Sequence, residues 1–291
     1  MRFASLGSGS QGNATLVKTK DTLILVDCGF PRRETERRLQ HLNVAPEDID
    51  AIIVTHEHGD HSGGVASVSR HYKIPVYLTH GTAGSGRLSG VFQQVLLNAG
   101  DDFTIGSVHV RAIPVPHDAR EPVQFRFEAS GGTLGLLTDL GSITPHLVDA
   151  FSGCDALLLE FNHDLGLLMQ GSYPASLKRR VAGDFGHLNN NQALELLQKL
   201  DNHRLKVLVA GHLSLKNNSK EHALAALAIA ADYHQAAVHI ACQDSGFGWL
   251  SVAGEADFSL AEAASAWCFQ RRLLHNQSSG WLRIASSVSS A

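Results

Sequence analysis

The sequence predicts an α/β protein in which two sheets pack face to face and helices cover their outer faces. Three observations support this fold class. Short apolar and β-branched runs alternate with helical patterns in two successive halves of the chain. Histidines and other polar residues follow several predicted strands, at ends that would share one edge of the sheets. No linker divides the halves, so we expect a single sandwich of four layers, αββα.

Length, composition, net charge and cysteine content restrict the classes of protein to which the chain can belong. The 291 residues are 44% hydrophobic, which suits one large domain or two small ones. No run approaches the ~18 apolar residues of a membrane span, and residues 1–5 lead into Gly and Ser, so we expect a cytoplasmic protein without a membrane partner. The net charge of −4 gives no overall attraction to nucleic acid, which would need local cations or metals. The four cysteines form no CxxC pair, which predicts reduced core thiols.

The first half alternates strands with helices. Strands are expected over residues 1–6, 14–17, 22–26, 51–54 and 75–79, and helices over residues 31–42 and after Gly59. Residues 7–12 match G-x-G-x-x-G, but a dinucleotide site needs a helix directly after the glycines, and residues 13–17 have the pattern of a returning strand. The segment is either a tight turn or a loop that presents N–H groups to a phosphate. Asp27, at the end of a strand, either orients a ligand histidine or is an ordinary strand-end residue.

The second half repeats the alternation. Strands are expected over residues 107–115, 123–129, 133–138, 156–160, 205–210, 237–242 and 247–252, and helices near residue 145 and over residues 176–181, 191–200 and 220–234. We expect residues 1–258 to form one domain. Residues 259–274 predict an amphipathic helix, and a Ser-rich, flexible tail follows to residue 291.

Residues 55–61, T-H-E-H-G-D-H, place three imidazoles and a carboxylate directly after an apolar strand. His56 and His58 are two residues apart in extended chain, so both point the same way and can reach one ion. Asp60 and His61 follow the turn at Gly59 and can face a second ion. The protease motif H-E-x-x-H fails here, because its last position is Asp60. The segment therefore predicts two metal ions.

Three further candidates follow later strands: His117, Asp139 and His212. With these residues the chain resembles the metallo-β-lactamase superfamily, whose pattern is H-x-H-x-D-H followed by His, Asp and His. Within it the chain is most similar to the YycJ/WalJ group of bacterial hydrolases, described as DNA exonucleases. The segments that carry this resemblance are residues 8–14, 159–164, 173–174, 177–178, 186–188 and 211–214.

The resemblance implies an αββα metallo-β-lactamase sandwich and a ligand set. His56, His58 and His117 would bind one ion, Asp60, His61 and His212 the other, and Asp139 would bridge them. Two ions can share a bridging hydroxide nucleophile and stabilise charge on a phosphoryl oxygen. Asp60 would also orient this hydroxide and so act in catalysis. Mixed imidazole and carboxylate ligands favour Zn²⁺, with Mn²⁺ or Fe²⁺ as alternatives.

His187 occupies the Gly-His position that contacts phosphate and assists the leaving group in phosphodiesterases of the superfamily. We expect it to be catalytic, with a hydrogen-bonded helix-entry residue as the alternative. Three residues are candidates for substrate binding. His163 either lines the substrate groove or caps its own loop, and Lys178 belongs to a basic run that is otherwise a solvated helix face. Asn189 stands where the YycJ-like group is expected to have Ser.

These residues lead to a functional prediction with two alternatives. The prediction is a dinuclear metal-dependent phosphodiesterase that hydrolyses nucleic acid, as an exonuclease on DNA. The first alternative is a metal-dependent hydrolase of a small ester, thioester or cyclic phosphodiester. The second is a metalloprotein without enzymatic activity, which is disfavoured because structural zinc sites are closed and four-coordinate, whereas seven ligands for two ions leave positions open. The sequence leaves the oligomeric state open.

Overall fold

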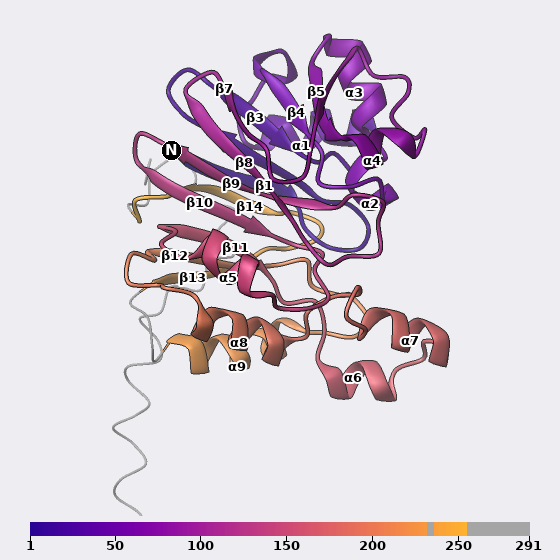
Figure 1. The fold of residues 1–291 in the computed structure, drawn as a ribbon, viewed down its shortest axis with the longest axis vertical. Helices are drawn as coiled ribbons and strands as arrows, with labels where there is room; N and C mark the ends of the chain where they lie inside the picture. Colours follow the sequence, from indigo (N-terminus) through magenta and orange to yellow (C-terminus); the bar gives the residue numbers. More distant parts are fainter. Residues whose placement is uncertain (232–235, 255–291) are drawn as a thin grey trace, which may run out of the picture.

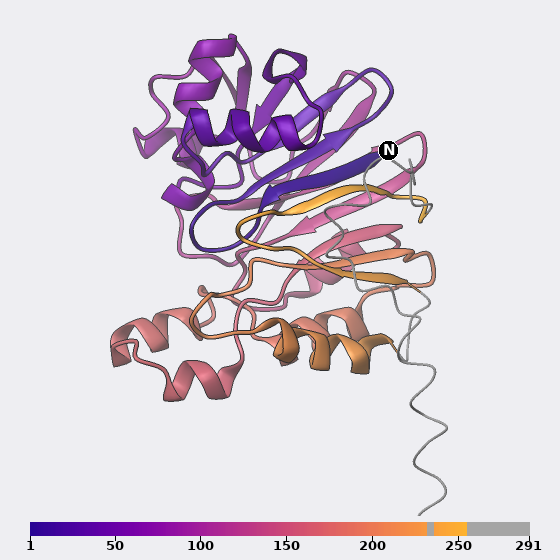
Figure 2. The same ribbon diagram turned by 180° about the vertical axis from the view of Figure 1, so that it is seen from behind.

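The computed structural model describes residues 1–231 and 236–254. Two seven-stranded sheets stack at its centre, and helices cover the outer face of each (Figures 1 and 2). The predicted four-layer αββα class is confirmed. The predicted helix over residues 259–274 and the tail after it lie outside the described residues, as does the end of the helix predicted over residues 220–234.

The first sheet contains the strands of the N-terminal half and one strand from the end of the described chain. Its order is β14-β1-β2-β3-β4-β5-β6. The bounds are β1 Arg2–Gly7, β2 Ala14–Lys18, β3 Leu23–Val26, β4 Ala51–Ile53, β5 Pro75–Thr79, β6 Gln93–Leu97 and β14 Phe247–Ser251. Strand β14 pairs antiparallel with β1, so the second half of the chain closes an edge of the first sheet.

The second sheet has the order β13-β12-β11-β10-β9-β8-β7. Its strands are β7 Asp102–Ile105, β8 Val108–Pro114, β9 Val123–Ala129, β10 Gly132–Leu137, β11 Ala156–Glu160, β12 Val207–Gly211 and β13 Ala237–Ile240. Strands β10, β11 and β12 are parallel, with Leu137 opposite Leu159 and Glu160 opposite Gly211. Their carboxyl ends therefore meet at one edge of the sheet, the usual place for a site in parallel α/β sheets.

The helices are α1 Arg32–His41, α2 Gly59–Ser62, α3 Val65–Tyr72, α4 His80–Gly84, α5 Pro145–Phe151, α6 Leu165–Gln170, α7 Ala175–Val181, α8 Asn190–Lys199 and α9 Lys220–Ala231, with a 3₁₀ turn at Pro46–Asp48. Helices α4 and α6 were not predicted from the sequence. Asp164 caps α6 by accepting a hydrogen bond from the Leu167 N–H, which satisfies a donor that the start of the helix leaves free. Helices α6 and α7 project at one end of the sandwich (Figure 1).

Three apolar clusters hold the layers together. The central cluster lies between the sheets and includes Phe3 and Ile24 from the first sheet and Phe125 and Phe127 from the second. A second packs the outer face of the first sheet against α1 and α3, and a third packs the second sheet against α5, α8 and α9. Burial of this surface stabilises the sandwich and fixes the strand ends relative to one another.

Among the described helices, none combines the length and the apolar character that crossing a membrane requires.

Candidate active site

The site lies where the strands of both sheets end. His56 and His58 follow β4, while His117, Asp139 and His212 follow β8, β10 and β12. Asp60 and His61 lie in the short helix α2, which starts at Gly59. Two close approaches hold this corner together. The Asn13 N–H donates to the Asp60 carbonyl at 2.7 Å, and a Cβ at Gly29 would lie 1.9 Å from this same oxygen, so only glycine fits.

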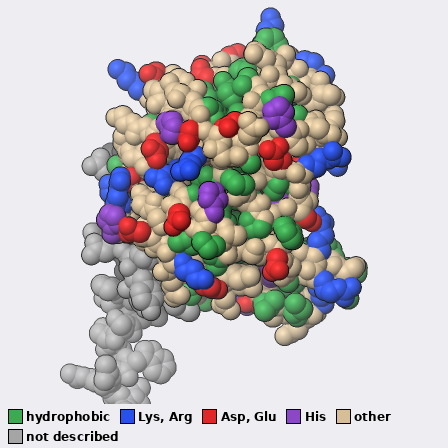
Figure 3. All heavy atoms as spheres, in the orientation of Figure 1, with side chains coloured by type: hydrophobic (Ala, Val, Ile, Leu, Met, Phe, Trp, Pro, Cys, Tyr) green, Lys and Arg blue, Asp and Glu red, His purple; other side chains and the backbone are tan. Residues whose placement is uncertain are grey.

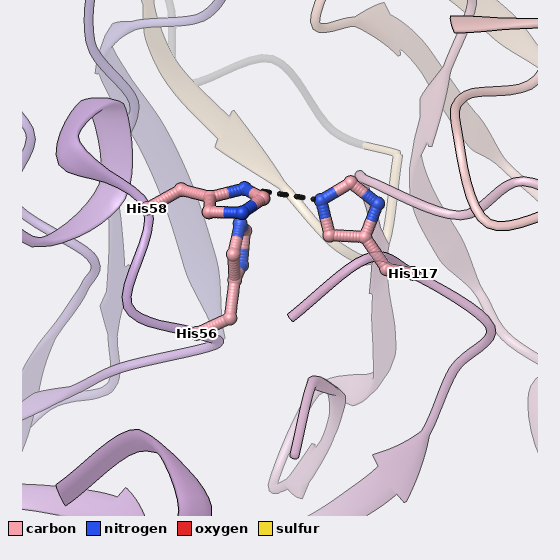
Figure 4. Close-up of side chains that lie close together, drawn as sticks. All are labelled: His56, His58 and His117. Carbon is pink, nitrogen blue, oxygen red and sulfur yellow. Dashed lines mark hydrogen bonds between the residues drawn. The ribbon is translucent and has the colours of Figure 1, made fainter. Parts of the chain in front are cut away.

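His56, His58 and His117 form the first cluster, in which one ring nitrogen of each lies within 4.8 Å of the others. Figure 4 shows His117 facing His58, with His56 beside His58. The ring centroid of His56 lies 4.6 Å from that of His58 and 4.9 Å from that of His117. Three imidazoles that converge in this way can share one cation.

Asp60, His61 and His212 form the second cluster, in which one ring nitrogen or carboxylate oxygen of each lies within 4.8 Å of the others. Asp139 lies between the two. Its Oδ2 atom is 3.0 Å from Nε2 of His61, and its Oδ1 atom is 3.9 Å from Nε2 of His117. The structure thus brings together all seven residues predicted as ligands.

Unpaired buried atoms test whether these side chains fit a metal. Within residues 1–231 and 236–254, Nε2 of His56, Nε2 of His212 and Oδ2 of Asp139 are buried atoms without a hydrogen-bond partner, although Oδ2 of Asp139 lies 3.0 Å from Nε2 of His61. Buried polar atoms in folded proteins are nearly always paired. Atoms of these types, converging on one place, are the ligands of a divalent cation.

The protonation states agree with this fit. Burial lowers the pKa of His56 well below its ordinary value, which favours the neutral imidazole that a metal needs. Burial would raise the pKa of the Asp139 carboxyl, but the imidazoles of His212 and His61 hold it well below its ordinary value. Burial would also lower the pKa of His212, yet Asp139, Asp60 and Glu160 raise it to about 10. The ionised carboxylates therefore favour a positive charge among these side chains, as a bound divalent metal ion would supply.

Two buried carboxylates orient the histidines from behind. Asp27 accepts from Nδ1 of His61 at 2.8 Å, and from the hydroxyl and N–H of Thr55 at 2.8 and 2.9 Å. This is the orienting role considered for Asp27 in the sequence. Such partners fix the ring orientation and leave the other nitrogen for a ligand.

Glu160 is the second of these carboxylates, and the sequence analysis gave it no role. Its side chain is fully buried at the end of β11. Oε1 accepts from Nδ1 of His187 at 2.9 Å and from Nδ1 of His212 at 2.8 Å. Oε2 accepts from the Leu188 N–H at 3.0 Å. A charged residue that ends an apolar strand beside other site-bearing strands was the available signal.

His187 lies beside the clusters, with its Nδ1 atom 3.6 Å from Oδ1 of Asp139. The hydrogen bond to Glu160 uses Nδ1, so Nε2 remains for another partner. Burial would lower the pKa of His187, but the Glu160 carboxylate raises it above its ordinary value. The ring lines the cavity described next.

A cavity of about 310 Å³ opens over the clusters. His58, Asp60, Asp139, His187 and His212 line it, together with Arg87 and Arg180. On the face seen in Figure 3, acidic and basic side chains are interspersed rather than gathered into one basic surface. Among the described residues, Arg87 and Arg180 are the Lys or Arg side chains that line the cavity.

The three predicted substrate-binding residues do not line this cavity. His163 is fully buried, its Nδ1 atom pairs with the Asn162 side chain at 3.2 Å, and burial lowers its pKa to about 4. Lys178 donates to the Met169 carbonyl at 2.6 Å. Asn189 caps α8, where its side chain accepts from the Gln192 N–H. Each has a local structural role.

Three of the site residues adopt left-handed backbone conformations although they are not glycine. The φ angles are 58° for Asp27, 56° for Asp139 and 54° for His212. Asp and His are among the few residue types that tolerate this region.

Comparisons with known proteins agree with the fold and the ligand pattern. A family model described as the β-lactamase superfamily domain matches residues 22–212. The chain is 35% identical to exodeoxyribonuclease YycJ of Bacillus anthracis over 225 residues, which are 76% of this chain and 85% of that protein. It is also 35% identical to exodeoxyribonuclease WalJ of Streptococcus pneumoniae over 226 residues, 76% of this chain and 84% of the relative.

A solved structure shows the same fold. The metallo-β-lactamase fold protein YhfI from Bacillus subtilis superposes with a TM-score of 0.65 at 16% identity, covering 86% of this chain and 98% of the other.

Proposed function

The chain belongs to the metallo-β-lactamase superfamily, in its YycJ/WalJ-like group, and is a metal-dependent hydrolase; from this premise we propose that it is a dinuclear phosphodiesterase acting as a DNA exonuclease. One observation carries the proposal. His187 lines the cavity while Glu160 holds it beside Asp139, so a proton donor stands next to the candidate metal ligands. The names of the two relatives, both exodeoxyribonucleases, support DNA as the substrate.

The proposed ligand assignment follows the two clusters. His56, His58 and His117 would hold one ion and Asp60, His61 and His212 would hold the other, while Asp139 lies between the two clusters. We favour Zn²⁺ for this donor set, with Mn²⁺ or Fe²⁺ as alternatives. When bound, two such ions supply an activated water and neutralise charge on the phosphoryl group.

The protein's own groups complete the reaction. His187, held at Nδ1 by Glu160, donates a proton from Nε2 to the departing oxygen. Asp60 orients the attacking water. Its Oδ2 atom accepts from the Asn13 side chain at 3.3 Å, and its side chain remains a quarter exposed toward the cavity.

The size of the cavity supports attack at a chain end. About 310 Å³ is at the lower end of the range for small-ligand sites, so it suits one nucleotide rather than a duplex. This same property favours the second candidate, a small ester, thioester or cyclic phosphodiester, because such a molecule needs no extended groove.

End-labelled single- and double-stranded DNA and RNA test the proposal. The metal-loaded protein is expected to release nucleotides from the ends of DNA, and His187→Ala is expected to lose this activity while keeping its metal content. His203→Ala provides the matched control, because His203 is exposed and does not line the cavity. If no nucleic acid is cut but His187→Ala and His203→Ala both hydrolyse small esters, the hydrolase of a small molecule replaces the DNA exonuclease as the proposed function.

A further inference from the structure

Arg87 lines the same cavity as the metal-binding clusters, and no role has yet been assigned to it. It lies between α4 and β6, in a loop rich in glycine and serine. This loop is fixed on both sides of Arg87. The Leu88 side chain is fully buried, and the Leu88 carbonyl accepts from the Gln94 side chain at 2.9 Å. On the other side, the Arg120 guanidinium donates to the Gly84 carbonyl at 3.2 Å. The Arg87 side chain is thus exposed, while the backbone on both sides of it is held in place.

The guanidinium lies against the turn between the two clusters. A Cβ built at Gly59 would be 3.7 Å from Nη1 of Arg87, the nearest atom outside its chain neighbours and the backbone of its own helix. Gly59 directly follows His58 and precedes Asp60. The guanidinium group of Arg87 therefore lies within van der Waals range of the turn that carries His58 and Asp60, at the edge of the metal-binding site.

Arg87 also differs from the other arginine of the cavity in its partners. The Arg180 side chain donates to the Asp118 carboxylate. Within residues 1–231 and 236–254, Arg87 forms no ion pair, and only its backbone N–H has a hydrogen bond, to the Ser85 hydroxyl at 3.3 Å. Its five guanidinium donors are therefore available to a ligand.

Charge is distributed unevenly around the cavity. Arg180 is joined through Asp118 to the side of His58, because Oδ1 of Asp118 lies 4.0 Å from Nε2 of His58. Both arginines thus flank His58. Hydroxyl and amide groups, including those of Tyr173, Ser214 and Asn217, line the rest. A neutral polar lining suits a nucleoside, whereas guanidinium groups suit phosphate, which they bind in a bidentate manner.

We propose that Arg87 binds the phosphate group next to the scissile one, on the part of the polynucleotide that leaves the cavity past His58. This inference rests on the proposed function. It assigns to Arg87 a role in holding chains of two or more phosphates, and none in cleaving the bond itself. A substrate with a single phosphodiester offers Arg87 nothing to bind.

Substrates that differ by one phosphate test the proposal. The metal-loaded wild type, Arg87→Ala and Arg87→Lys are assayed on a dinucleoside monophosphate and on a trinucleoside diphosphate. Arg87→Ala is expected to raise KM for the longer substrate by roughly 10- to 100-fold, the usual effect of losing a charge-assisted hydrogen bond, and to leave the shorter substrate unaffected. Arg87→Lys keeps the charge without the planar fork and is expected to recover part of the loss.

Equilibrium binding gives a readout that is independent of turnover. A labelled oligonucleotide is titrated with His187→Ala and with the His187→Ala, Arg87→Ala double variant, both metal-loaded, at several salt concentrations. Removal of one phosphate contact is expected to reduce the slope of log K against log salt by about 0.7. Arg33→Ala is the matched control, because Arg33 is exposed on α1 and does not line the cavity.

The outcomes separate this inference from the proposed function. A wild type that hydrolyses neither substrate contradicts the proposed function. A wild type that hydrolyses both, with Arg87→Ala impaired equally on the two or with an unchanged salt slope, contradicts only the role of Arg87.

Discussion

The carboxylate of Glu160 holds His187 by a hydrogen bond of 2.9 Å to Nδ1. The same Oε1 atom accepts from Nδ1 of His212 at 2.8 Å, so one buried oxygen orients a proposed proton donor and a proposed metal ligand together. Replacement of Glu160 should therefore affect catalysis and metal binding at once.

Glu160→Gln is expected to lower kcat by about 10- to 100-fold, a typical effect of losing an outer partner of a metal-binding histidine. The amide keeps the shape but removes the charge that favours protonated His187. The measurement is kcat on end-labelled DNA together with the metal content. Glu121→Gln is the control, since Glu121 also accepts backbone hydrogen bonds, from Gly81 and Ala99, but lies outside the cavity. Equal kcat values for Glu160→Gln and Glu121→Gln would contradict this role of Glu160.

Asp27→Asn is expected to weaken metal binding by about 10- to 100-fold and to change cleavage at saturating metal much less. Asp27 contacts His61 from behind and does not line the cavity, so its substitution disturbs the orientation of the ring. Asn also tolerates the left-handed backbone of this position. Metal titration followed by calorimetry checks the prediction, and an unchanged affinity would contradict it.

Removal of the metal ions by a chelator is expected to lower the melting temperature. A ligand that binds only the folded state stabilises it by about 2.7 kcal/mol at one hundred times its dissociation constant. For a domain of this size, this corresponds to a shift of roughly 5 to 10 °C. Differential scanning calorimetry with chelator, and then with Zn²⁺ restored, measures the shift. The Asp139→Ala variant should show a smaller one, and identical shifts in both proteins would argue against a site that includes Asp139.

Thiol labelling is expected to distinguish the cysteines. Burial raises the pKa of Cys28 to about 11 and that of Cys154 to about 12, so neither forms an appreciable fraction of thiolate near neutral pH. Cys242 is exposed, which the prediction of four core thiols had wrong. Partial desolvation would raise its pKa, but hydrogen bonds from Ser245 lower it below the ordinary value.

In a Cys268→Ser variant, a disulfide reagent at pH 8 should therefore modify one thiol in the folded protein and three after unfolding in guanidinium. Cys268 is replaced because it lies outside the described residues. Fast labelling of two or more thiols in the folded state would show that the buried pair is accessible.

The sequence predicted the layers and the ligand clusters for a physical reason. Four of the seven candidate ligands lie within six residues, and the others follow strands whose apolar patterns are clear. Glu160 does not belong to such a cluster, because its partners His187 and His212 are 27 and 52 residues away, and its place at the end of an apolar strand was the signal available in the sequence. The parallel pairing of β11 with β12 places Glu160 opposite Gly211, next to His212, and His187 reaches Glu160 from the segment between α7 and α8.

The basic run shows a different limit. Lys178 was singled out with its neighbours, but residues two apart on a helix do not face the same way. Lys178 points to the Met169 carbonyl, while Arg180 reaches Asp118 and lines the cavity. Arg87 gave no signal at all, since a single arginine in a loop of glycines and serines has no pattern. Its position depends on the packing of Leu88.

The left-handed backbone of Asp139 and His212 has an evolutionary consequence. Few residue types with a side chain accept this conformation readily, chiefly Asn, Asp and His. Among these three, Asp and His are also the ones that bind divalent cations best. The backbone conformation and the coordination chemistry therefore favour the same two residue types, and Glu, although its carboxylate can bind a cation, is disfavoured by the backbone. Substitutions at Asp139 and His212 are therefore restricted both by the left-handed backbone and by the need for a side chain that binds a cation.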